Sequence, residues 1–138
     1  MTQATVGEGV NYISDENWNK TQLFNLSSDY LDAPIKIGLQ SGLAVFSFGG
    51  RLLKDVGLND TTIANTKSLD GFPLPPANMR GLFMDITSPE SDGGVMGVLA
   101  WYTDGRIVMN LNKAYKASTN HYFNASLTGV TKAVPTNK

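Results

Sequence analysis

The chain has 138 residues, a length that fits one domain built around one core. Hydrophobic residues make up 41% and charged residues only 17%, so neutral polar side chains must cover much of the surface. Asn, Ser, Thr and Gly fill that role, and they favour turns and strand margins over helix interiors. Eleven basic residues against twelve acidic ones create no strong field, so we expect no nucleic-acid partner.

Further function classes are disfavoured by what the sequence lacks. No apolar run approaches the roughly 20 residues that cross a bilayer, and residues 1–10 have neither the basic nor the apolar region of a signal peptide. The absence of cysteine excludes disulfides and thiolate chemistry. We therefore expect a chain that is made in the cytoplasm and is not inserted in a membrane.

The polar residues 1–16 are predicted to be an arm or linker, and Trp18 to plug the core where the domain proper begins. Apolar residues then alternate at period two over 35–40 and 43–48, the spacing that places them on one face of a strand. Ser41-Gly42 between these segments predicts a hairpin turn. Gly49-Gly50 predicts a bulge or a sharp bend at the end of the second strand.

The rest of the chain is also predicted to form strands separated by turns. Three prolines within residues 73–76 exclude a helix or a central strand there. Asp104-Gly105 between two alternating segments is a strong hairpin signal. Further strands are predicted at 21–26, 61–64, 81–86, 95–102, 106–111 and 122–127. We predict an all-β fold, an antiparallel β-sandwich or barrel in a single domain over residues 17–130, followed by a polar tail, residues 131–138.

Catalytic chemistry is disfavoured. His121 is the only histidine, and the chain has no nucleophile elbow, phosphate-binding loop or calcium loop. A catalytic triad through His121, or a pair of glycosidase carboxylates, stays open as a minor alternative because sequence does not show which residues meet. We predict no catalytic residue, no metal site and no cofactor.

A saccharide site needs aromatic faces for the sugar ring and planar hydrogen-bonding groups for its hydroxyls. Candidates gather in the C-terminal half, where the ends of adjacent strands are expected to converge. Successive strand residues point to opposite faces, so one of Trp101 and Tyr102 is expected in the core, and Asp104 is also explained as a turn residue. The predicted ligand-binding residues are Trp101, Tyr102, Asp104, Tyr115, His121 and Tyr122.

The order of these landmarks resembles a domain found at the ends of tailed-phage adsorption devices. The landmarks are Trp18, Leu23-Phe24-Asn25, Ile35-Lys36-Ile37-Gly38, Phe46 to Leu52, Gly71-Phe72-Pro73, Leu82 to Ile86, Asp104 to Ile107, and Tyr122 to Leu127. They are similar in particular to head domains of baseplate receptor-binding proteins from phages of lactic acid bacteria. The resemblance implies a β-barrel or sandwich head, usually a homotrimer, that recognises cell-wall saccharides or glycerol-phosphate polymers. This chain lacks the N-terminal coiled coil or interlaced neck of that pattern.

Two main hypotheses follow. The first is a non-catalytic phage adsorption module, located in the virion at the tail tip or baseplate, that binds bacterial cell-wall saccharide and contacts other baseplate or tail proteins. The second is a structural baseplate or decoration module that uses the same fold without binding a ligand. Exposed aromatic side chains would favour the first, and a large apolar interface patch would favour the second.

Overall fold

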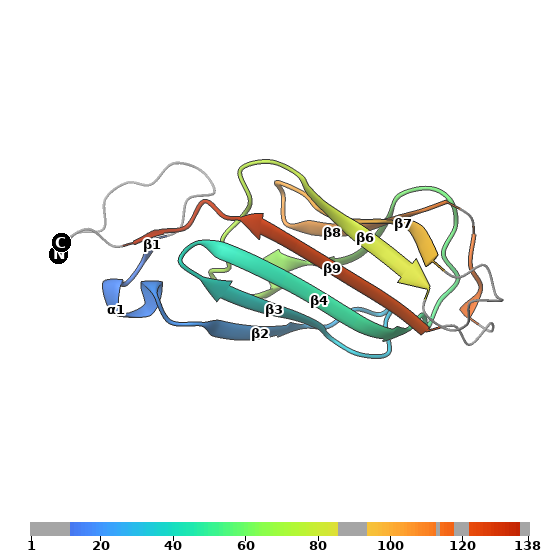
Figure 1. Ribbon diagram of the computed structural model, residues 1–138, viewed down its shortest axis with the longest axis horizontal. Coiled ribbons are helices and arrows are strands. Elements are labelled where there is room, and N and C mark those ends of the chain that lie inside the picture. Colours follow the sequence, from blue (N-terminus) through green and yellow to red (C-terminus); the bar gives the residue numbers. More distant parts are fainter. Residues whose placement is uncertain (1–11, 86–93, 113, 118–121, 136–138) are drawn as a thin grey trace.

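The computed structural model describes residues 12–85, 94–112, 114–117 and 122–135, which form a mainly β structure (Figure 1). Each predicted strand is present, with its bounds shifted by no more than three residues where these are described. The elements in chain order are β1 Tyr12–Ile13, α1 Asp15–Trp18, β2 Gln22–Leu26, β3 Ile35–Gln40, β4 Leu43–Arg51, β5 Thr61–Asn65, the 3-10 turn η1 Thr66–Ser68, β6 Met79–Asp85, β7 Gly94–Trp101, β8 Arg106–Leu111, β9 Tyr122–Val130 and β10 Val134–Pro135.

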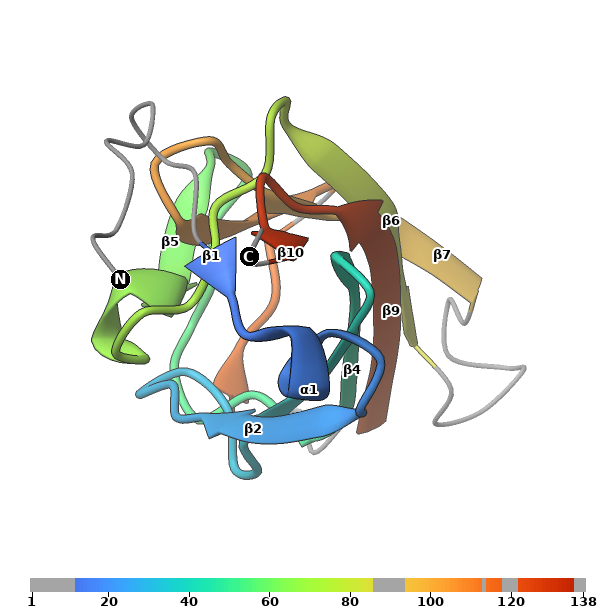
Figure 2. The ribbon, with the colours of Figure 1, turned by 90° about the vertical axis from the view of Figure 1, so that its left-hand side faces the viewer.

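Eight of the strands are antiparallel neighbours in the order β2-β3-β4-β9-β6-β7-β8-β5. They form two four-stranded sheets, β2-β3-β4-β9 and β6-β7-β8-β5, which pack against each other. The two sheets are continuous only where residues 83–85 of β6 pair with residues 123–125 of β9. Seen end-on in Figure 2, they surround the core without closing into a barrel. The predicted all-β fold is confirmed, in its sandwich form.

Both predicted hairpins are confirmed by their turns. Ser41 and Gly42 have φ values of 51° and 78°, and two positive φ values in succession fit the twist of an antiparallel pair. In the other hairpin the backbone N–H of Tyr102 donates to the carbonyl oxygen of Arg106 at 2.9 Å, closing a three-residue connection. Gly105 there has a φ of 93°, which a residue with a Cβ rarely adopts.

The predicted bulge or bend at Gly49-Gly50 is wrong, because β4 pairs with β9 without interruption through Arg51. Gly50 is buried, and a Cβ on it would overlap the carboxylate of Asp32. That carboxylate accepts a hydrogen bond from the backbone N–H of Arg51 at 2.8 Å. The glycine therefore makes room for a contact between the β2–β3 connection and the end of β4.

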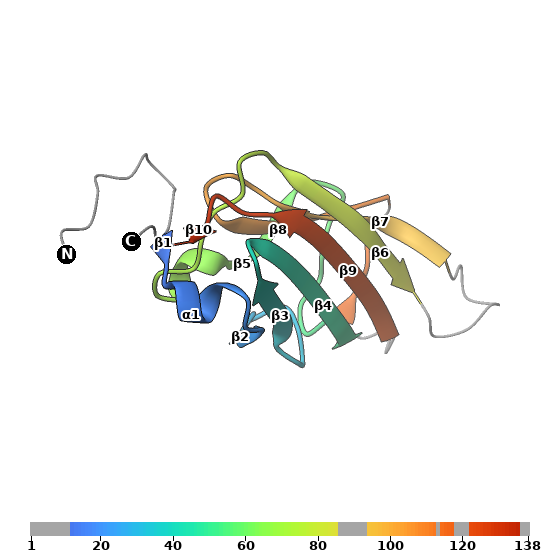
Figure 3. The ribbon, with the colours of Figure 1, turned by 60° about the vertical axis from the view of Figure 1, so that its left-hand side comes forward.

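Parts of the predicted arm and tail belong to the fold. β1 pairs in parallel with β10, and both lie at the same end of the sandwich as α1 (Figure 3). Ile13 packs against the core, and Ala133 is only 5% exposed. The predicted domain, residues 17–130, therefore leaves out β1 and β10, which pair with each other and belong to the fold.

The two sheets meet around aromatic side chains. The ring of Trp101 on β7 lies 4.8 Å from that of Phe46 on β4 and 6.1 Å from that of Phe72, and Trp101 has 0% exposure. Its indole Nε1 donates to Thr66 Oγ1 at 3.2 Å, and this hydroxyl donates to the carbonyl oxygen of Gly105 at 3.2 Å. Trp101 therefore packs against both sheets while its one polar atom stays hydrogen-bonded, as burial of an indole requires.

Trp18 is not the core plug that the sequence predicts. It is half-buried and lies against the Ser41-Gly42 turn, where its backbone carbonyl accepts a hydrogen bond from the N–H of Ser41 at 2.8 Å. The single turn of α1 follows Ser14, a favourable residue type at a helix N-terminus, and ends at Trp18. Trp18 thus fastens α1 to the sheet instead of filling the core.

We predict that Trp101→Ala lowers the free energy of unfolding by about 3–5 kcal/mol, because it leaves a large cavity and removes the indole N–H that donates to Thr66 Oγ1. Trp18→Ala is the matched control and should cost clearly less, since its side chain is already partly hydrated. Urea denaturation monitored by circular dichroism measures both values. Equal losses would show that Trp101 has no special place in the core.

Candidate functional site

The predicted ligand-binding residues do not converge. β7 and β9 are both antiparallel to β6 and therefore run in the same direction. Trp101 ends β7, whereas Tyr122 begins β9, so these residues lie at opposite ends of the sandwich. Tyr115 lies near the Tyr122 end, with its ring 5.8 Å from that of Phe123. The expected single cluster is wrong because sequence order does not reveal strand direction in the sheet.

Burial removes two of the six predicted residues from any surface site. Trp101 is fully buried and Tyr115 is 7% exposed, both within the hydrophobic core. Their predicted role in ligand contact is therefore corrected to packing. His121 lies outside the described residues.

Tyr102 and Asp104 remain at the surface, but both are used within the protein. The Tyr102 hydroxyl donates to Asp60 Oδ2 at 3.3 Å, and the Arg106 guanidinium lies 4.8 Å from the Tyr102 ring centroid. Arg106 Nε donates to Asp104 Oδ2 at 2.8 Å, and Arg106 N donates to Asp104 Oδ1 at 3.1 Å. Asp104 thus acts as a turn residue, the alternative that the sequence left open.

Tyr122 is 46% exposed on the β2-β3-β4-β9 sheet, here called the outer sheet, at the end of the sandwich opposite Trp101. Arg51 Nη2 donates to its hydroxyl at 2.7 Å, and the guanidinium carbon lies 4.2 Å from the ring centroid. One face of this ring is therefore already covered by a cation. No concave site that includes Tyr122 is present among the described pockets.

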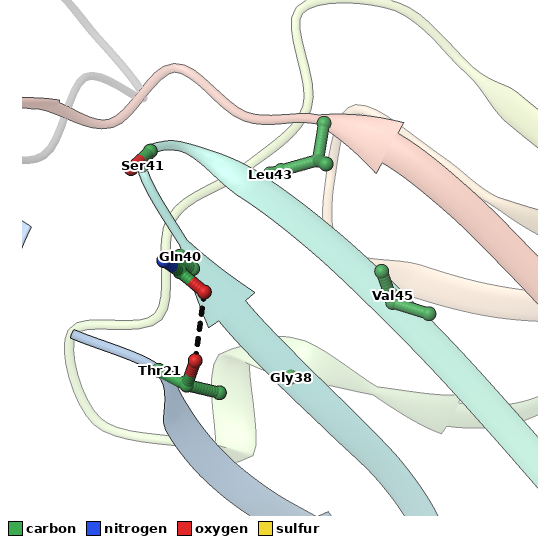
Figure 4. A pocket seen from close by; sticks show the side chains of 6 residues that line it. All are labelled: Thr21, Gly38, Gln40, Ser41, Leu43 and Val45. Carbon is green, nitrogen blue, oxygen red and sulfur yellow. Dashed lines mark hydrogen bonds between the residues drawn. The ribbon is translucent and has the colours of Figure 1, made fainter. Parts of the chain in front are cut away.

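The outer face of β2, β3 and β4 carries a shallow depression of about 550 Å³ (Figure 4). Leu43 and Val45 form its apolar side. At its polar end Thr21 Oγ1 donates to Gln40 Oε1 at 2.7 Å, and Gln40 Nε2 donates to the carbonyl oxygen of Asn19 at 2.9 Å. These polar groups satisfy one another, so the depression presents mainly apolar surface.

A second concavity lies at the α1 end of the sandwich and is here called the end pocket. It has a volume of about 320 Å³ and is bounded by α1, by β2 and the end of β3, and by the loop 70–73. Phe72 holds that loop in place because it is 7% exposed and packs edge-on with Phe24, with ring centroids 5.0 Å apart. The lining residues are Ile13, Ser14, Asn17, Gln22, Phe24, Leu39, Asp70, Gly71, Phe72 and Pro73.

The polar side chains of the end pocket have no partner within the described part of the chain. None of the hydrogen bonds or ion pairs there involves the side chain of Ser14, Asn17, Gln22 or Asp70. Two amides, a carboxylate and a hydroxyl therefore remain available beside the half-buried ring of Phe24. This combination of free polar groups and an aromatic ring distinguishes the end pocket from the depression on the outer sheet.

Sequence reasoning missed the end pocket because its residues are spread over positions 13 to 73. The signal that exists is Gly71-Phe72-Pro73, an aromatic residue inside a proline-rich loop. Such a residue tends to be buried, and its loop is then drawn against the neighbouring strand. The sequence alone does not show that the neighbouring strand is β2, which carries Phe24.

Comparison with protein-family models, with curated protein sequences and with solved structures found no match. Within the described ranges, no three His, Asp or Glu side chains are placed to hold a metal ion. Those ranges also contain no helix that is long and apolar enough to cross a membrane.

The Asp104 carboxyl gives a prediction for pH dependence. The hydrogen bond from the Arg106 backbone N–H lowers the pKa of Asp104, assisted by the Arg106 guanidinium. A lowered folded-state pKa stabilises the fold above the unfolded-state pKa, and this stabilisation is lost as the pH falls through the folded-state pKa.

Wild type should therefore be more stable than Asp104→Asn at pH 6, by less than about 1 kcal/mol because the ion pair is exposed. The difference should vanish near pH 2. Chemical denaturation of both proteins across this range measures it. A difference that grows toward low pH would contradict the assignment.

Proposed function

We propose that this chain is a non-catalytic adsorption module of a phage tail tip or baseplate that binds bacterial cell-wall saccharide in the end pocket. The observation that supports it is a set of planar side chains, Asn17, Gln22 and Asp70, that lie beside the ring of Phe24 and have no partner among the described residues. The order of sequence landmarks described above supports the phage origin.

The chemistry of the end pocket suits a sugar unit. Amide side chains both donate and accept hydrogen bonds, and a carboxylate accepts them, so together they match the hydroxyl groups around a sugar ring. Phe24, which is half-buried in the lining, supplies apolar surface for the C–H face of the ring. A volume near 320 Å³ is at the lower end for small-molecule pockets, which favours one or two sugar units over a longer stretch of polymer.

Binding at one such pocket is expected to be weak. Each hydroxyl exchanges water for a protein partner, so each contact contributes little net free energy. We expect a dissociation constant in the millimolar range for a single pocket, which corresponds to a binding free energy of about −4 kcal/mol. Many copies on one virion, arranged as homotrimers, would then attach firmly to the repeated units of a cell wall.

We predict that Asn17→Ala and Asp70→Ala each weaken binding of purified host cell-wall saccharide about three- to tenfold, the effect of losing one or two hydrogen bonds. Asn124→Ala is the matched control, because Asn124 is an exposed asparagine on β9 outside the end pocket. Titration by nuclear magnetic resonance suits millimolar affinities. Unchanged binding by both folded pocket variants would place the site elsewhere.

A second candidate function is the structural baseplate or decoration module, which the outer sheet favours. Large apolar side chains on that face are exposed, and Leu23 reaches 81%. Gly38 lies between Leu23 on β2 and Val45 on β4 in one cross-strand row, which leaves a hollow beside the exposed leucine. The exposed apolar residues of this sheet face are Leu23, Leu43, Val45 and Val130.

The two functions predict different defects in phage particles that carry this chain. If the outer sheet packs on another virion subunit, Val45→Asp should prevent incorporation of the chain, because a buried carboxylate would be left unpaired. Asp70→Ala particles should assemble normally and adsorb poorly. Normal assembly and adsorption with Val45→Asp would exclude the structural role for this face.

A further inference from the structure

We propose that the end pocket selects amino sugars over neutral sugars, and neutral sugars over phosphorylated or acidic ones, through the carboxylate of Asp70. This inference rests on the proposed function, since it names the ligand class of the same pocket. It follows from the charges and hydrogen-bonding capacity of the lining residues.

Among the described residues that line the end pocket, Asp70 alone is charged. Its side chain is exposed, and it has no ion pair or hydrogen bond with the described residues. The carboxylate of Asp104 is different, because Arg106 pairs with it directly. The negative charge of Asp70 is thus available to a ligand.

A carboxylate only accepts hydrogen bonds, so its partner must donate one. A sugar hydroxyl donates, and a sugar ammonium group donates while adding an opposite charge. A phosphate or carboxylate on the ligand has acceptor oxygens and a like charge, so it opposes Asp70 on both grounds. None of the other lining residues is basic, so nothing in the lining offsets that repulsion.

The expected preference is modest because Asp70 is exposed to water. Exposed charge pairs change affinity by a factor of about two to five. Such a factor should fall as salt is added, because ions screen exposed charges. Hydrogen bonds from neutral hydroxyls should be much less sensitive to salt.

The test is a titration of the full chain with glucosamine, glucose and glucose 6-phosphate, followed by residue-resolved nuclear magnetic resonance. We expect the three sugars to shift the amide signals of Asn17, Gln22 and Gly71, with affinity in the order given and steps of about two- to fivefold. Residue resolution separates this pocket from the outer sheet, where Lys36 could attract the phosphate.

The Asp70→Asn variant keeps a planar side chain and removes its charge. In this variant glucosamine and glucose should bind equally, and glucose 6-phosphate should no longer be disfavoured. Asp29→Asn changes the net charge identically at an exposed position outside the pocket, and it should keep the wild-type order.

The outcomes separate this inference from the proposed function. If all three sugars shift the pocket signals with equal affinity, or if Asp70→Asn keeps the wild-type order, the charge selection is overturned while saccharide binding stands. If none of the sugars shifts the pocket signals, both proposals are overturned.

Discussion

The contact between Trp101 and the phenylalanines around it is the interaction on which the rest of the structure depends. It joins β4 of one sheet to β7 of the other through rings 4.8 Å apart. Through Phe72 it also draws in the loop 70–73, because that ring lies 6.1 Å from Trp101 and 5.0 Å from Phe24. The end pocket is thus a consequence of core packing: the loop that forms its rim is anchored by a core side chain.

The polar side chains around Tyr102 and those of the end pocket differ in whether they have partners among the described residues. Around Tyr102 the side chains are paired with Asp60, Arg106 and Asp104, so a ligand would have to displace existing bonds. In the end pocket the polar side chains have no hydrogen-bond or ion-pair partner among the described residues, so a ligand would displace water from them and break no such bond. Solvated groups that surround an apolar floor can bind a polar ligand without rearranging the protein.

Much of the fold could be predicted from sequence because its signals are local. Period-two alternation identified the strands, and Ser41-Gly42 and Asp104-Gly105 identified two hairpins. The roles of the two tryptophans depend on contacts between residues that are far apart in the sequence. Both lie beside polar segments in the sequence, and only the packing of β7 against β4 buries Trp101 and leaves Trp18 at the surface. The role of Gly50 could not be predicted for the same reason, because the residue that needs its small size, Asp32, comes from another part of the chain.

The candidate site was harder to predict than the fold, since it depends on how strands are ordered. β9 lies between β4 and β6, and this placement separates Tyr122 from Tyr102 by the length of the sandwich. The same ordering leaves β2 at an edge of the sheet, where the loop 70–73 and α1 complete the end pocket. Residues 17, 22 and 70 share no sequence pattern that would bring them together.

The most direct test of the proposed saccharide binding is a crystal structure of the chain with an oligosaccharide from a bacterial cell wall. The account predicts a sugar ring over Phe24, between α1 and the loop 70–73, within hydrogen-bonding distance of Asn17, Gln22 or Asp70. An oligosaccharide bound instead at the Tyr102 hairpin, at Tyr122 or on the outer sheet, with the end pocket empty, would contradict it.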